Sequence, residues 1–194
     1  MTIPCALNDP IPISVLAGSI VPIYEAAASA HSTTDLLTSP VSLYLVMGTS
    51  HGTAIGYWYN EDGTNTYGTY RNMVFYAVTG SDNTIRLYVL SGDVNVDDEH
   101  TIPAHALSKF YIAGNPVSFS YATYVDEKGD EVTMQAATDY DPELGLSTVY
   151  VNEGINASED NLYTFYAHGS NSSSVTFPAI SEVASKFEDR LVFA

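Results

Sequence analysis

Residues 117–137 read VSFSYATYV, DEKGD and EVTMQAA, which are two runs of alternating side chains joined by a charged turn. In the first run Val117, Phe119, Tyr121, Thr123 and Val125 share one face, because successive side chains of a strand point to opposite sides. The small and polar residues between them, with Tyr124, share the other face. The segment therefore predicts an antiparallel hairpin whose arms are residues 117–125 and 131–137.

The same two-residue period continues on both sides of this hairpin. Further strands are expected at residues 41–47, 53–60, 64–70, 72–79, 84–90, 147–152, 162–168 and 173–177. Helical signals are few: alanines over 24–37, and a segment over 181–191 with Ser181 as its cap and Val183 and Phe187 four residues apart. Parallel α/β folds need crossover helices. The sequence therefore predicts an all-β antiparallel sandwich, similar to a jelly roll, with a short C-terminal helix.

The first forty residues differ from the rest. They contain five of the nine prolines and no Lys or Arg, yet they carry many aliphatic side chains. Proline removes a backbone donor and favours extended chain before it. We therefore expect an extended arm over residues 1–40 and one β domain over 41–194. The arm's partner-binding residues are expected to be Ile3, Leu7, Ile11, Ile13, Val15, Ile20 and Val21.

The charge excludes some partners. With 6 Lys and Arg against 23 Asp and Glu, the 194-residue chain has a formal charge of −17. Nucleic-acid binding depends on neutralising phosphates with cations, and anionic membranes repel such a surface. We expect neither nucleic-acid nor membrane binding. With 45 % hydrophobic residues, the chain also has enough apolar material for one compact core.

The N-terminal sequence bears on the compartment. It has no basic region, and prolines and polar residues interrupt its apolar run, so a signal peptide is not expected. The single cysteine, Cys5, excludes an intrachain disulfide. We expect synthesis in a cytoplasm and a final location on a virion or extracellular particle.

An acidic loop is the candidate metal site. Asp93, Asn95, Asp97 and Glu99 place oxygen ligands close together, as Ca²⁺ prefers, although the loop lacks the glycine and the final glutamate of an EF-hand. A solvated acidic loop is the alternative. Asp139, Asp141 and Glu143 form a second acidic group, and His100 and His105 have no common zinc-site spacing.

Two further motifs bear on function. Residues 48–52, GTSHG, match the nucleophile-elbow pattern around Ser50, but a strand rather than a helix is expected to follow, so the pattern is read as coincidence. Tyr57, Trp58 and Tyr59 are a candidate platform for stacking sugars, against the alternative of ordinary cross-strand packing.

These features favour a non-enzymatic structural assembly protein. An all-β domain with an apolar arm suits association by strand addition, and tyrosines suit interfaces. We expect a virion component, either a capsid decoration or tail protein, that self-associates as a trimer or dimer and binds other structural subunits. The alternative is a surface-exposed carbohydrate-binding or adhesion module. No cofactor is expected beyond the candidate Ca²⁺.

Overall fold

The computed structural model describes residues 14–27, 29–48, 52–61, 70–94, 102–114, 118–126, 128–134, 136–152, 154–169 and 175–191. The strands in these residues are β1 (Ser19–Tyr24), β2 (Val41–Val46), β3 (Thr53–Glu61), β4 (Tyr70–Thr79), β5 (Ile85–Val94), β6 (Leu107–Ala113), β7 (Phe119–Val125), β8 (Glu131–Thr133), β9 (Ala136–Asp141), β10 (Leu146–Val151) and β11 (Asn161–Ala167). The helical segments are the 3-10 helix η1 (Thr33–Leu36), α1 (Ile180–Lys186) and α2 (Glu188–Leu191).

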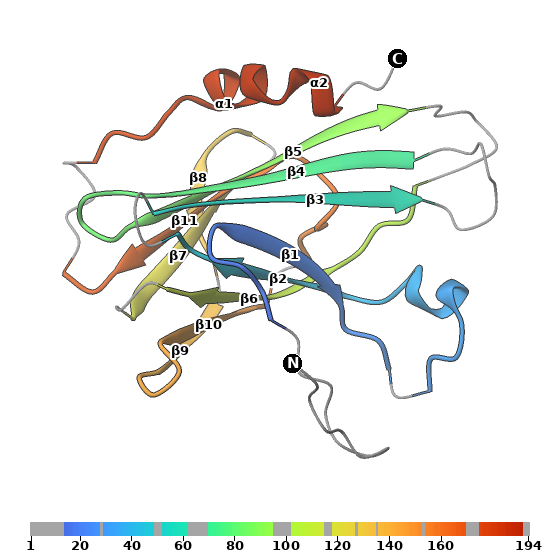
Figure 1. Cartoon of the computed structure of the whole chain (residues 1–194), viewed down its shortest axis with the longest axis horizontal. Helices are drawn as coiled ribbons and strands as arrows, with labels where there is room; N and C mark the ends of the chain where they lie inside the picture. Colours follow the sequence, from blue (N-terminus) through green and yellow to red (C-terminus); the bar gives the residue numbers. More distant parts are fainter. Residues whose placement is uncertain are drawn as a thin grey trace, which may run out of the picture.

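The described strands form one curled sheet. Its order is β8-β7-β11-β5-β4-β3-β1-β2-β6-β10-β9, and it bends into a half-barrel (Figure 1). The pairs β1–β3 and β2–β6 run parallel, and the other neighbouring pairs run antiparallel. The prediction of a mostly β protein is confirmed. The sheet is mixed rather than antiparallel, so the sandwich or jelly roll is not confirmed.

Strand β1 lies inside this sheet. It pairs with β2 from Ser19↔Val46 to Tyr24↔Val41, and Ser19 also pairs with Ile55 of β3. Ser19–Tyr24, expected within the extended arm over residues 1–40, therefore form a strand of the sheet itself. The sequence did not predict this strand because it contains Pro22, and proline is uncommon in strands that are paired on both sides. The domain division at residue 40 stays a prediction.

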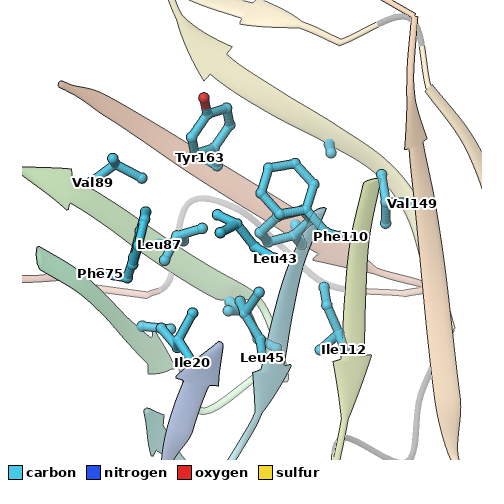
Figure 2. Packing of buried hydrophobic residues seen from close by; sticks show 14 of the residues in the cluster. Ile20, Leu43, Leu45, Phe75, Leu87, Val89, Phe110, Ile112, Val149 and Tyr163 are labelled. Carbon is cyan, nitrogen blue, oxygen red and sulfur yellow. The ribbon is translucent and has the colours of Figure 1, made fainter. Parts of the chain in front are cut away.

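The concave face of the sheet encloses the main core. Every second residue of β2 and β4 points inward, and the buried residues include Leu43, Leu45 and Phe75 (Figure 2). The ring of Phe110 lies 5.0 Å from that of Tyr163 and 4.9 Å from that of Phe165, both edge-on. Such aromatic pairs contribute roughly 0.5–1.5 kcal/mol beyond their buried area. This contact joins β6 to β11, which lie far apart in the sheet order.

Residues 175–191, here called the C-terminal strap, cover the outer face of β4 and β5 (Figure 1). Val183 is fully buried against Val74, Tyr88 and Leu90. The predicted C-terminal helix is confirmed as α1 and α2, interrupted at Phe187. Ser181 does not cap it, because the cap position is Ala179, which makes no side-chain hydrogen bond.

Most of the expected strands are present, with shifted ends. The sequence missed β1, β6 and most of β9, because the strand expected at 131–137 covers β8 and only the first two residues of β9; residues 175–177 form no strand. Residues 62–69 lie outside the described ranges, so the strand expected at 64–70 is described only at Tyr70, where β4 begins. The helix expected over 24–37 is reduced to η1, which begins with Ser32 and Asp35 in a reciprocal capping box.

Candidate binding surface

A group of polar and aromatic side chains lies on the outer face of β2, β6 and β10. Leu43, Phe110 and Val149 point into the core, so the alternate residues of these strands point outward. The register places Ser42 and Tyr150 beside Lys109, and Tyr44 beside Tyr111. We call this group the lysine–tyrosine patch; its members are Glu25, Ser42, Tyr44, Ser108, Lys109, Tyr111 and Tyr150.

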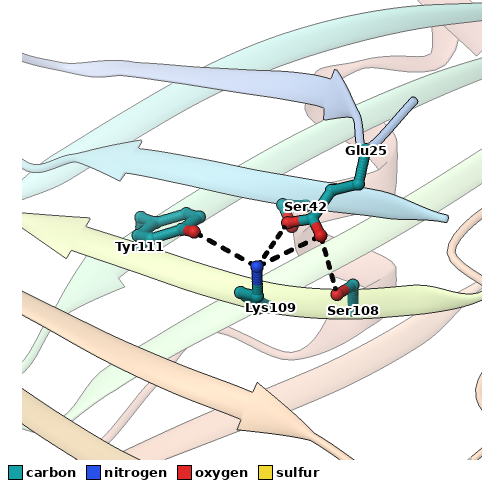
Figure 3. Close-up of polar contacts among 5 residues, drawn as sticks. All are labelled: Glu25, Ser42, Ser108, Lys109 and Tyr111. Atoms are coloured by element: carbon teal, nitrogen blue, oxygen red, sulfur yellow. Dashed lines mark hydrogen bonds and ion pairs between the residues drawn. The ribbon is translucent and has the colours of Figure 1, made fainter. Parts of the chain in front are cut away.

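Glu25, which follows the end of β1, ties three strands together at the patch (Figure 3). Lys109 Nζ lies 2.9 Å from Glu25 Oε1 and 3.1 Å from Oε2. Ser42 Oγ donates to Oε1 at 2.5 Å, and Ser108 Oγ donates to Oε2 at 3.3 Å. Both oxygens of the carboxylate therefore have partners on β2 and β6.

Tyrosine rings surround the lysine. The rings of Tyr44 and Tyr111 are stacked, with centroids 4.2 Å apart and planes 22° from parallel. Lys109 Nζ lies 5.8 Å from the ring centroid of Tyr111 and 5.9 Å from that of Tyr150, within the reach of a cation–π contact. Tyr150 is 40 % exposed. The patch thus offers large amphipathic rings held in place by neighbouring strands.

The electrostatics keep the ion pair charged. Partial burial raises the pKa of the Glu25 carboxyl, but the hydrogen bonds from Ser42 and Lys109, with the charge of Lys109, lower the pKa below its ordinary value overall. The hydrogen bond to Glu25 raises the pKa of Lys109. Partial burial raises the pKa of Tyr44. A carboxylate with a lowered pKa and partners on both oxygens is poorly suited to general acid–base catalysis, whereas rigid aromatic rings suit binding.

A polar pocket of about 430 Å³ adjoins Glu25. The segment between β1 and β2 forms its walls, which carry the hydroxyls of Thr34, Thr38 and Ser39. Asp35 Oδ2 accepts hydrogen bonds from the backbone of His31 and Ser32, and these bonds lower the pKa of the Asp35 carboxyl. This pocket contains no aromatic ring among its described lining residues, so it resembles a solvated loop more than a sugar site.

The structure places the three aromatic residues of the predicted sugar platform on two opposite faces of β3. Trp58 is only 8 % exposed, and its Nε1 donates to the hydroxyl of Tyr24 at 3.2 Å inside the half-barrel. Tyr57 and Tyr59 point to the other face and are each 51 % exposed. The prediction that all three rings form one stacking surface is therefore wrong, because alternation along β3 puts the indole on the core side.

The predicted cation site lies almost outside the described residues. Asn95, Asp97 and Glu99 are not described, and only the backbone of Asp93, near the end of β5, is. In the second acidic group, Asp141 Oδ1 accepts hydrogen bonds from the backbone N–H groups of Glu143 and Leu144, so this carboxylate stabilises its own turn. Within the described ranges no three His, Cys, Asp or Glu side chains gather to hold a metal. Binding of Ca²⁺ by Asp93–Glu99 stays a prediction.

The structure describes only three of the seven predicted partner-binding residues. Ile3, Leu7, Ile11 and Ile13 lie outside the described ranges, as do Ser50, His51 and His100. Val15 and Val21 are half-buried, whereas Ile20 is 3 % exposed. The prediction that Ile20 contacts a partner is wrong, because the core of the domain covers this side chain.

The lysine–tyrosine patch was missed by sequence reasoning. Its only local signal is Lys109, a charge within the apolar segment LSKFYIA that became β6. Glu25 is 84 residues away in sequence, and only the β1–β2–β6 pairing brings the two charges together.

None of the described helices is long and apolar enough to cross a membrane.

Comparisons with known proteins give a fold likeness. No family model and no curated protein sequence matches this chain. The Tris-bound glucosidase II alpha subunit matches with a TM-score of 0.51 at 13 % identity, over 77 % of this chain and 16 % of that one. The alpha3-Glc2-bound subunit matches at 0.50 and 14 %, and a chain of the ER glucosidase II heterodimeric complex at 0.50 and 16 %, with the same coverages. About three quarters of this chain thus shares its fold with a part that makes up about one sixth of the length of each glucosidase II chain.

Proposed function

We propose that this chain is a non-enzymatic assembly domain that packs against a carbohydrate-processing polypeptide through the lysine–tyrosine patch. The observation that carries the proposal is the outer face of β2, β6 and β10, where Tyr44, Tyr111 and Tyr150 gather around Lys109. Tyrosine is enriched in protein interfaces because each ring buries a large area with few rotatable bonds.

The fold likeness supports this class of partner. In the glucosidase II structures the similar fold accounts for about 16 % of the chain and is accompanied by the rest of the subunit. A small domain in that position needs a surface that contacts the remaining polypeptide. The C-terminal strap covers the outer face of β4 and β5, whereas the outer face of β2, β6 and β10 carries Tyr150, which is 40 % exposed, so this face is available for such a contact.

A non-enzymatic role is supported by the way the carboxylates are used. Glu25 is held by Ser42, Ser108 and Lys109, and Glu131 accepts from Thr123 and Tyr166. Both groups hold strands together. Assembly was the role expected from the sequence; the virion location and self-association stay predictions, since no described residue bears on them.

The test is a binding measurement with a matched pair of tyrosines. The chain is mixed with the carbohydrate-processing polypeptide encoded next to it, and the complex is followed by sedimentation velocity. We expect Tyr150→Ser to weaken the complex at least tenfold. Tyr57→Ser removes a similarly exposed ring from β3, which three strands separate from β10 in the sheet, and we expect it to leave the affinity unchanged.

Either of two results overturns the proposal. One is a neighbouring coding sequence for capsid or tail proteins with none for a carbohydrate-processing protein. The other is a complex that survives Tyr150→Ser and is lost with Tyr57→Ser.

Carbohydrate binding is the second candidate, now restricted to β3. Tyr57 and Tyr59 are exposed, and the ring of Tyr59 lies 4.6 Å from that of Tyr70. Adjacent exposed rings suit stacking against sugar faces. Glycan-array binding that is lost with Tyr59→Ala, and kept with Tyr150→Ala, would favour this function over the first.

A further inference from the structure

A pocket of about 420 Å³ lies between the C-terminal strap and the end of the β7–β11 pair. One wall is formed by residues 177–180 of the strap, and the other by Val125 and Asp126 at the end of β7 and by residues 160–162 at the start of β11. This volume falls within the roughly 300–1,000 Å³ range of ligand pockets in proteins. The pocket is separate from the lysine–tyrosine patch and shares no residue with it.

The walls are largely apolar. Leu162, Phe177 and Ile180 line the pocket, and Ile180 is 45 % exposed although it begins helix α1. The strap is fixed here, because the hydroxyl of Tyr88 donates to the carbonyl oxygen of Pro178 at 2.6 Å. An exposed aliphatic side chain on an anchored wall favours a ligand with an apolar group of its own.

The rim is acidic. Asp126 and Asp160 line this pocket and also the neighbouring pocket of about 590 Å³, whose lining adds Glu159 and one cation, Lys128. Asp126 Oδ1 accepts from the backbone of Lys128 and Asp130, and Asp160 Oδ1 accepts from Ser91. The hydrogen bonds of the described residues thus use one oxygen of each carboxylate, and the other is available to accept from a cationic ligand.

The only described cation in the wall of the smaller pocket is shielded. The guanidinium of Arg86 lies 4.7 Å from the centroid of the Phe177 ring, which covers it, and its Nε is buried. Burial raises the pKa of the Glu131 carboxyl, but hydrogen bonds from Thr123 and Tyr166 and the charge of Arg86 lower it overall. Arg86 therefore acts within the protein, and the pocket presents its carboxylates to solvent.

We propose that this pocket binds a peptide segment in which an aliphatic side chain is flanked by Lys or Arg. The aliphatic group enters between Leu162, Phe177 and Ile180, and the basic groups pair with Asp126 and Asp160. The chain's charge of −17 attracts such a segment over long range and repels an acidic one.

The test is fluorescence anisotropy with three labelled tetrapeptides, Lys-Leu-Leu-Lys, Lys-Ser-Ser-Lys and Glu-Leu-Leu-Glu, each blocked at both ends. We expect saturable binding of the first at 150 mM salt, at least tenfold weaker binding of the second, and none of the third. Equal binding of the first two peptides would mean non-specific attraction to an acidic protein and would overturn the proposal. Absence of binding by all three would also overturn it.

Variants locate the binding. We expect Ile180→Ser and Asp126→Asn each to weaken binding of the first peptide at least tenfold. The asparagine keeps the Oδ1 acceptor that stabilises the turn through its bonds to Lys128 and Asp130. Ile23→Ser is the matched control, since Ile23 is 40 % exposed on β1, away from the pocket. Thermal denaturation confirms that each variant is folded. Equal affinities for Ile180→Ser, Asp126→Asn and the parent would place binding elsewhere and refute the proposal.

Discussion

At the scale of single residues, His105 shows how a polar side chain is accommodated in the core. Its Nδ1 lies 2.9 Å from the carbonyl oxygen of Ser39, and its Nε2 lies 3.2 Å from Asn60 Oδ1. The rings of Tyr24 and Trp58 pack on it at 5.2 and 5.3 Å. Nδ1 donates to the Ser39 carbonyl oxygen and Nε2 faces Asn60, so both ring nitrogens lie against the protein itself, which argues against the metal role considered for His105 from the sequence.

This burial predicts a pH dependence. Burial lowers the pKa of His105 below its ordinary value of 6.5, although the hydrogen bond to Ser39 opposes the change. The unfolded chain then binds the proton first, so the free energy of unfolding falls as the pH drops from the unfolded pKa to the lower folded pKa. Urea unfolding followed by the fluorescence of Trp58, the single tryptophan, measures this between pH 8 and 5.

His105→Gln is the control. We expect it to cost about 1–3 kcal/mol at pH 8, because a buried hydrogen-bonded side chain is changed, and to flatten the slope between pH 7 and 5. An unchanged slope would contradict the assignment to His105.

The Glu25–Lys109 pair gives a second prediction at this scale. Its side chains are 29 % and 24 % exposed, so we expect a coupling of about 0.5–1 kcal/mol in a double-mutant cycle of Glu25→Gln and Lys109→Met. The pKa of Glu25 is lowered, so its contribution is present above the unfolded pKa and is lost as the pH falls through the folded value. A cycle measured at pH 7 and then at successively lower pH should keep its coupling below the ordinary pKa of 4.5 and lose it as Glu25 becomes protonated.

At the scale of elements, the contact between β1 and β3 depends on Gly56. A Cβ at Gly56 would lie 2.1 Å from the carbonyl oxygen of Ile20 and 2.8 Å from its carbonyl carbon. Backbone cannot move away cheaply where β1 is paired on both sides. We therefore expect Gly56→Ala to destabilise the fold by about 3 kcal/mol or more in chemical denaturation. Gly154→Ala, which meets no atom within 4 Å, should change stability much less.

The strap gives a prediction of the same kind. Val183 is its fully buried residue against Val74, Tyr88 and Leu90. Val183→Ala should cost about 2 kcal/mol, because it removes buried methyl groups and leaves a small cavity. Ser185→Ala, an exposed change on the same helix, should cost much less. Equal effects in thermal denaturation would mean that the strap does not stabilise β4 and β5 in this way.

At the scale of the whole molecule, the position of β1 changes the test of the N-terminal arm. Deleting residues 1–23 removes β1 from between β3 and β2, so we expect loss of the cooperative unfolding transition. Deleting residues 1–13 keeps every described strand and should keep the fold. Solution mass of this shorter deletion then tests self-association through Ile3, Leu7, Ile11 and Ile13; an unchanged oligomer would contradict the arm hypothesis.

The strands β3, β4 and β5 could be predicted from the alternation of their side chains, because one face of each strand must be apolar. The face that each residue of β7 presents to the core could not be predicted in this way. Phe119 and Ala122 both enter the core, since the pairing with β11 shifts between Tyr166 and Ala167. Such a bulge depends on the partner strand and leaves no local pattern. The same holds for β6, where Lys109 interrupts the apolar period and pairs with Glu25, which is 84 residues away in sequence.

The sequence by itself determined that this chain is mostly β, strongly acidic and has a short helix near the C-terminus, because side-chain period and charge are properties of neighbouring residues. The tertiary structure alone decided that β1 enters the sheet parallel to β3, that Trp58 faces inward while Tyr57 and Tyr59 face outward, and that Glu25 meets Lys109. Those outcomes depend on which distant strands pair, and the free energy of pairing is shared among residues far apart in the chain.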